Sequence, residues 1–243
     1  MKRMVLATLV VTLLLTANNL FAQGRNSQME LYGGVGIPLG PEGFKDFYKL
    51  GLSLNAQYVF FASPSLGIPI FVGYERFTVD SDAIGEASAG DLVGLELFDS
   101  QGNVIGQVVD GRIDADGSAS TIKFGIGLRP YLTQPEAPTQ FFLFGTATFN
   151  LLKQKSEITG GSYTGSDFSG NEQIFDLTED DIISIYGGTE SKVDDEKFGL
   201  AGGAGIEIPA GSSLNLIIQG LFNIIFTEDE KTTFLGVTAG LVF

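Results

Sequence analysis

The chain has 243 residues, with no cysteine, no histidine, and 29 acidic against 14 basic side chains, for a net charge of −15. This acidic balance excludes the basic surface that binds nucleic acid, so we expect no nucleic-acid partner. Without cysteine there is no disulfide, and without histidine or cysteine the usual nucleophile–base devices of hydrolases are missing. We therefore expect a protein that is not an enzyme, with no catalytic residue and no cofactor.

The first 22 residues are typical of a secretory signal peptide. Lys2 and Arg3 precede the apolar run 5–15, and the small-residue site ending at Ala22 allows cleavage before Gln23. The apolar run is shorter than the ~20 residues that a membrane-spanning helix needs. We predict a mature domain of residues 23–243, which holds 12 basic and 29 acidic side chains and a net charge of −17.

Eight later segments alternate apolar and more polar residues, the period of a strand with one apolar face. They are Met29–Ile37, Leu50–Phe60, Ile68–Thr78, Thr121–Arg129, Gln140–Leu151, Lys197–Ile208, Leu214–Phe226 and Thr233–Phe243. An even number of such segments is the pattern of a membrane β-barrel. We predict an all-β fold, an eight-stranded antiparallel up-and-down transmembrane β-barrel.

The connections between these segments alternate in length. The short ones are Ser63–Pro64, Thr133–Thr139 and Pro209–Ser212, and the long ones are Gly40–Phe47, Asp80–Ser118 and Lys153–Glu196. This alternation predicts short periplasmic turns and long extracellular loops. Within the second long loop, the pattern of Leu92–Asp110 predicts a hairpin that stands above the membrane. The third is rich in Gly, Ser and acids, and we expect it to be mobile.

Six charged residues fall on the more polar, inward face: Glu30, Glu75, Lys123, Arg129, Lys197 and Glu207. An eight-stranded lumen is only wide enough to be filled by side chains, which favours structural ion pairs over an ion path. Positions along the strands put Glu75 and Lys123 at one height. Arg129 lies near the periplasmic end, where Glu30 and Glu207 are its expected partners.

Acidic clusters in the long loops are candidates for catalytic or calcium-binding sites. Glu179, Asp180 and Asp181 lie where nothing holds an acid–base geometry. Asp110, Asp114 and Asp116 fail the EF-hand spacing because position 112 is Arg. These acids, and Asp194, Asp195 and Glu196, are read as solvated loop residues, and no metal site is expected.

The signal peptide, the eight alternating strands, the loop asymmetry and the terminal Phe243 together resemble the small OmpA/OmpX-type outer-membrane β-barrels. The resemblance implies an outer-membrane location in contact with the lipid bilayer and lipopolysaccharide. It also implies insertion by the barrel-assembly machinery, with Phe243 and Leu241 as the assembly signal. No cell-wall-binding domain follows Phe243, so tethering by that route is not expected.

The leading hypothesis for function is an envelope scaffold or adhesin-like protein whose acidic extracellular loops contact an external protein or surface. One alternative is a narrow conduit or binding barrel for small apolar molecules, because five inward positions are apolar: Phe142, Phe144, Ile217, Leu221 and Ile225. A second alternative is a soluble, secreted barrel of lipocalin type, which would bury its apolar face inside.

Overall fold

The structure is a computed structural model that describes residues 27–243, apart from 100, 179–188, 212–213 and 228–229. The signal peptide and its cleavage site lie outside the described residues and stay predictions, as does the placement of Glu179, Asp180 and Asp181. The elements of the described part are β1 (Ser27–Gly40), α2 (Glu42–Phe47), β2 (Gly51–Ser63), β3 (Leu66–Thr78), α3 (Ser81–Leu92), β4 (Glu96–Phe98), β5 (Val104–Pro130), β6 (Gln140–Asp167), β7 (Glu172–Asp176), β8 (Glu190–Pro209), β9 (Asn215–Phe226) and β10 (Lys231–Val242).

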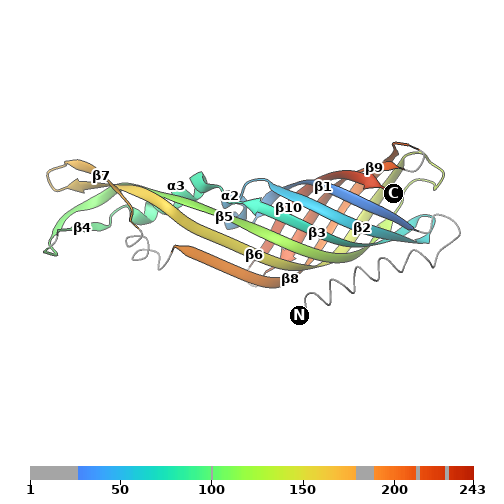
Figure 1. The fold of residues 1–243 in the computed structure, drawn as a ribbon, viewed down its shortest axis with the longest axis horizontal. Helices are drawn as coiled ribbons and strands as arrows, with labels where there is room; N and C mark the ends of the chain where they lie inside the picture. The colour runs from blue at the N-terminus through green and yellow to red at the C-terminus, as the bar shows by residue number, and fades with distance from the viewer. Residues whose placement is uncertain (1–26, 100, 179–188, 212–213, 228–229) are drawn as a thin grey trace.

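Eight of the described strands form a closed antiparallel barrel. β1, β2, β3, β5, β6, β8, β9 and β10 pair in chain order, and β10 returns to pair with β1. β4 and β7 are short additional strands on β5 and β6. Figure 1 shows the barrel at one end of the molecule and a long projection carrying β4, β7 and α3 at the other. The predicted fold class is confirmed.

The alternating pattern decides which side chains face out. On β1, Met29 and Leu31 are 48% and 42% exposed, whereas Glu30 between them is 0% exposed. The other barrel strands repeat this arrangement, and their outward residues, for example Leu54 and Leu128, are exposed. An apolar outer surface with a polar interior suits lipid as the surrounding solvent. It is the reverse of a lipocalin-type barrel, so the soluble alternative is wrong.

Small inward residues make room for large ones in the narrow interior. At Gly51 an added Cβ would lie 2.5 Å from Cδ1 of Phe77, so only glycine admits that ring. Phe77 is 4% exposed and packs with Ile225 and Phe234 in one buried cluster. The interior is thus filled by interlocking side chains, as expected for eight strands.

β5 and β6 continue far beyond the barrel and form the extension (β4, α3, β7, Val104–Gly117 of β5 and Ser156–Asp167 of β6). The two strands have 27 and 28 residues, so each spans ~90 Å at ~3.3 Å per residue. Their pairing runs from Leu128↔Gly145 to Gly106↔Asp167, with two register shifts. The hairpin predicted over Leu92–Asp110 is present, as β4 paired with the start of β5, although its second strand continues into the barrel. The expectation that 153–167 belongs to a mobile loop is wrong, because these residues form the outer part of β6.

Two helices also occupy segments that were predicted to be loops. α2 lies between β1 and β2, and α3 packs on the extension through a buried cluster of Leu92, Val108, Ile113 and Leu177. An added Cβ at Gly111 would lie 2.7 Å from Cδ1 of Leu92, which shows how closely α3 approaches the sheet. No helix in the described ranges is long and apolar enough to cross a membrane.

Candidate functional site

The periplasmic end of the lumen holds the Arg129 cluster, defined as Arg129, Glu30, Glu207, Gln28 and Tyr131. The Arg129 guanidinium binds the Glu30 carboxylate in a two-pronged contact, with Nη2 donating to Oε2 at 3.1 Å. Its Nη1 lies 3.6 Å from Glu207 Oε1. Gln28 Nε2 donates to both carboxylates at 2.6 and 3.0 Å, and the Tyr131 hydroxyl donates to Glu207 at 2.7 Å.

This cluster closes its end of the barrel. Arg129, Glu30 and Glu207 are each at most 1% exposed, and the guanidinium carbon lies 4.3 Å above the Phe142 ring. Buried charges are tolerated when they are paired and hydrogen-bonded in this way. The arrangement favours a structural plug over an ion path.

A second ion pair lies nearer the extracellular end. Lys123 on β5 and Glu75 on β3 face each other, with Nζ 2.5 Å from Oε1, and each residue is 4% exposed. Gly73 neighbours Glu75 on the inward face of β3 and leaves space for the Lys123 side chain. A Cβ added at Gly73 would lie 2.7 Å from Cε of Lys123. The structure thus brings together the two residues that the sequence placed at one height.

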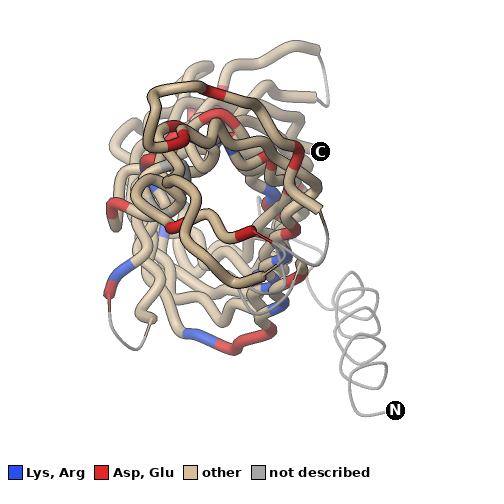
Figure 2. Tube along the Cα trace, turned by 90° about the vertical axis from the view of Figure 1, so that its left-hand side faces the viewer, with Lys and Arg blue, Asp and Glu red and all other residues tan. Residues whose placement is uncertain are grey.

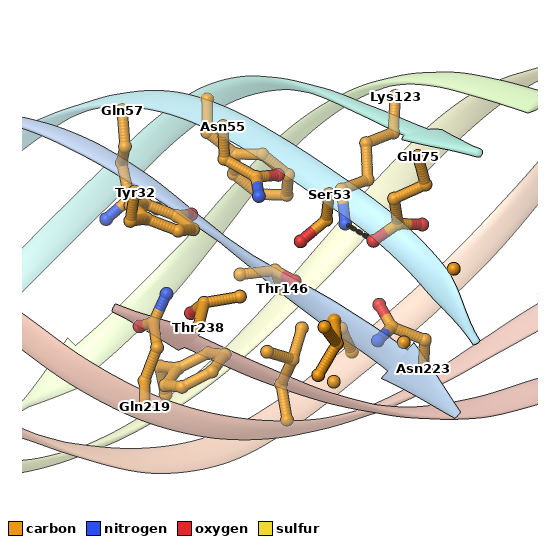
Figure 3. Close-up of a pocket in the computed structure, with 18 of the residues that line it drawn as sticks. Tyr32, Ser53, Asn55, Gln57, Glu75, Lys123, Thr146, Gln219, Asn223 and Thr238 are labelled. Carbon is orange, nitrogen blue, oxygen red and sulfur yellow. Dashed lines mark hydrogen bonds and ion pairs between the residues drawn. The ribbon is translucent and has the colours of Figure 1, made fainter. Parts of the chain in front are cut away.

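Between the two charged groups lies a small polar chamber, lined by Ser53, Thr146, Gln219, Asn223 and Thr238. Figure 3 shows Thr146 between Tyr32 on one side and the Lys123–Glu75 pair on the other. Each of the five chamber residues has a buried polar atom without a hydrogen-bond partner in the structure. The chamber volume of about 30 Å³ suits one or two water molecules, which satisfy such atoms in protein interiors. A chamber this small does not support the conduit alternative.

Lys197, the sixth inward charge, lies apart from these groups. Its side chain is 11% exposed and its Nζ lies 2.8 Å from Asp195 Oδ2 on the same strand.

The proposed assembly residues, Leu241 and Phe243, lie at the end of the barrel opposite to Lys197. Leu241 is on the outer surface opposite Leu31, and the backbone N–H of Phe243 donates to the Met29 carbonyl at 2.8 Å.

The acids of the candidate calcium site in the second long loop make local contacts. Asp114 pairs with Arg112 at 3.1 Å, and Asp110 and Asp116 each accept the backbone N–H of the next residue. Across the part of the chain that the structure describes, no group of three or more acidic, His or Cys side chains is placed to hold a metal ion.

Two matching turns cap the hairpins of the extension. The first belongs to the hairpin predicted over Leu92–Asp110, whereas the second was not predicted from the sequence. Asp99 Oδ1 accepts the Asn103 N–H at 2.9 Å, and Asp167 Oδ1 accepts the Asn171 N–H at the same distance. The side-chain amides of the two asparagines donate to the second carboxylate oxygens. These hydrogen bonds, foremost those from the asparagine side chains, hold the pKa of both aspartates below the usual 3.8. The signal was the repeated spacing Asp-x-x-Gly-Asn.

No protein-family model and no curated protein sequence matches this chain. Among solved structures, it resembles Neisserial surface protein A at 10% identity, over 89% of this chain and 95% of that one, with a TM-score of 0.45. Ail of Yersinia pestis, solved with the heparin analogue sucrose octasulfate, is 13% identical over 90% and 99%, with a TM-score of 0.42. The outer membrane protease OmpT of Escherichia coli is 10% identical over 90% and 96%, also at 0.42.

Proposed function

We propose that this protein is a non-enzymatic outer-membrane scaffold that holds an acidic contact surface outside the cell. The observation that carries the proposal is the continuity of β5 and β6 from the barrel into the extension. A connection of a few residues closes a hairpin, so barrel closure alone does not account for strands this long. The barrel is the anchor and the extension is the part that meets a partner.

The charge of the two long loops that contain the extension supports this role. Residues 80–118 and 153–196 hold 20 of the 29 acidic side chains and only four basic ones. Figure 2 looks onto the end of the molecule that carries the extension, where red acidic positions outnumber blue basic ones. Three of the four bases are in ion pairs with nearby acids: Arg112, Lys155 and Lys192. The surface therefore presents a net negative field to its surroundings.

A surface of this kind favours a cationic partner. Exposed acids attract a basic protein surface, or they bind divalent ions that bridge to neighbouring lipopolysaccharide. The charges are solvent-exposed, so the interaction weakens as salt shortens the Debye length to ~8 Å at physiological ionic strength. The partner arrives from outside, and export through the signal peptide and insertion by the barrel-assembly machinery precede the contact.

Trimming the extension tests the proposal. Thr78 pairs with Ser118 and Lys155 pairs with Lys192, so an Asn-Gly turn can replace residues 79–117 and another can replace 156–191. The trimmed barrel should fold and insert, as shown by heat-modifiable gel mobility. Cells that display it should adhere less to surfaces and to other cells than cells that display the full chain.

A charge variant separates acidity from length. Asp110, Asp114 and Asp116 changed together to asparagine keep the extension but remove three exposed charges from one strand. Adhesion should fall and lose part of its salt dependence. Undiminished adhesion by the trimmed barrel, with normal insertion, would leave only a passive membrane scaffold.

A further inference from the structure

Above the sealed lumen lies a cup of about 530 Å³ at the extracellular end of the barrel. Its walls come from α2, the start of α3, and the outer ends of β3, β5, β6, β8, β9 and β10. The five aromatic residues that line it are Phe44, Phe47, Tyr48, Phe77 and Phe234. Aliphatic side chains, among them Ile84, Leu152 and Ile225, complete a mainly apolar lining.

The floor of the cup is preformed by aromatic packing. The Phe77 ring lies 4.9 Å from Phe44 and 5.4 Å from Phe234, in edge-to-face contacts of 71° and 68°. Such contacts stabilise a fixed arrangement of rings. Phe77 and Phe234 are themselves buried, so the cup ends on them and does not continue into the polar chamber. It is a blind site and not the mouth of a channel.

The charges near the mouth are balanced. Lys153 and Glu230 carry opposite charges, and Asp195 is paired with Lys197 at 2.8 Å. An ion that entered the cup would lose its hydration without gaining an excess counter-charge, which is unfavourable. An uncharged apolar molecule loses little hydration and gains contact with the rings.

We propose that the cup binds a small, uncharged, predominantly apolar molecule. Its volume lies within the ~300–1,000 Å³ of typical ligand sites. At ~30 Å³ per water molecule, the cup has room for roughly 18 waters, so a compound of two or three fused rings fits. The site is distinct from the proposed contact surface, because its walls lie at the barrel end and not at the tip of the extension.

The experiment uses the full chain in lipid nanodiscs with ¹³C-labelled methyl groups, and naphthalene as the probe. Detergent is avoided because its tails are themselves apolar ligands. Methyl resonances of Ile84, Leu152 and Ile225 should shift along a saturable curve. Those of Leu128 and Leu216, which face lipid, should change only in proportion to the naphthalene that partitions into the bilayer. If the cup methyls follow the same proportional course, the proposal is overturned.

A matched pair of variants locates the site. Ala119 packs against the floor, so Ala119→Trp fills the cup and should weaken binding at least about tenfold. Ile122→Trp adds the same ring on the lipid face and should leave the dissociation constant within about twofold. If gel mobility shows that Ala119→Trp does not fold, Phe44→Ala removes a wall ring and should weaken binding about fivefold. If the variant that folds still binds naphthalene saturably and as tightly as the wild type, the assignment of the binding site to the cup is overturned.

A charged analogue tests the ligand class. 2-Naphthoate has the same fused rings and a carboxylate, and it should bind at least about tenfold more weakly than naphthalene. Equal affinity for the two compounds would overturn the assignment to uncharged molecules. Because no part of the extension tip is altered, these outcomes are independent of the adhesion experiments.

Discussion

The Lys123–Glu75 ion pair offers the sharpest test of how the interior is held together. Lys123→Met removes the ammonium group 2.5 Å from Glu75 Oε1 and leaves that carboxylate buried. A buried charge stranded in this way costs about 3–5 kcal/mol of unfolding free energy. Adding Glu75→Gln removes the stranded charge, so the double variant should lie within about 1 kcal/mol of the wild type.

Urea unfolding of the barrel in lipid vesicles measures these free energies. At a slope of ~2 kcal/mol per molar urea, the single variant should shift the midpoint downward by about 2 M and the double variant by under about 0.5 M. Lys155→Met is the control, because it breaks an ion pair with Glu157 that is 49% and 45% exposed. Its midpoint should match that of the wild type.

The unfolding midpoints of the single and double variants decide whether Lys123 and Glu75 stabilise the barrel as a pair. Equal midpoints for Lys123→Met and the double variant would refute the pairing as an energetic unit. A wild-type midpoint for the single variant would mean that water in the polar chamber solvates Glu75 as well as Lys123 does.

Deleting Phe243 should lower the yield of heat-modifiable barrel in the membrane fraction, because its backbone hydrogen bonds with Met29 close β10 onto β1; an undiminished yield speaks against an assembly signal. The Asp99 and Asp167 turns should keep their order above a pH of about 3.8 and lose it at lower pH. The sign follows because both folded-state pKa values are depressed, so the stabilisation is lost as pH falls through them. Amide exchange at Gly102 and Gly170 measures this, and a turn carrying Asp99→Asn should show no such pH dependence. N-terminal sequencing of the membrane-extracted protein should begin at Gln23, and a retained Met1 would contradict the predicted cleavage.

The barrel was predictable because lipid and a narrow lumen impose a strict period of two. The segment Met29–Ile37 falls inside β1, and its inward Glu30 is where the alternation placed it. Positions along the strands were enough to bring Lys123 and Glu75 to a similar height, because antiparallel pairing converts position along the chain into height. In the register Lys123 lies opposite Gly73, so it reaches Glu75 diagonally. These inferences needed only local pattern and topology.

Apart from the hairpin over Leu92–Asp110, the extension was not predictable in the same way. Val104–Gly117 is rich in Gly and Asp, and a register shift between Val108 and Asp110 interrupts its apolar alternation. Its strand conformation comes from pairing with β6, whose residues lie far away in sequence. α3 contains Gly85 and Gly90, which weaken a helix, and its packing on Gly111 favours it instead. The aromatic cup is lined by residues from eight elements, so no single stretch of the sequence predicts it. The run Phe44, Phe47 and Tyr48 in the first long loop was the available signal.

The plug formed by the Arg129 cluster has a consequence for how abundant this protein can be. A barrel with an open lumen adds a leak for solutes with every copy, so its number per cell is limited by the permeability that the envelope tolerates. Here the buried guanidinium and its two carboxylates occupy the cross-section of the barrel. Copies can therefore be crowded into the membrane without changing what passes through it, and the weak external contacts proposed above would then add up to a strong attachment.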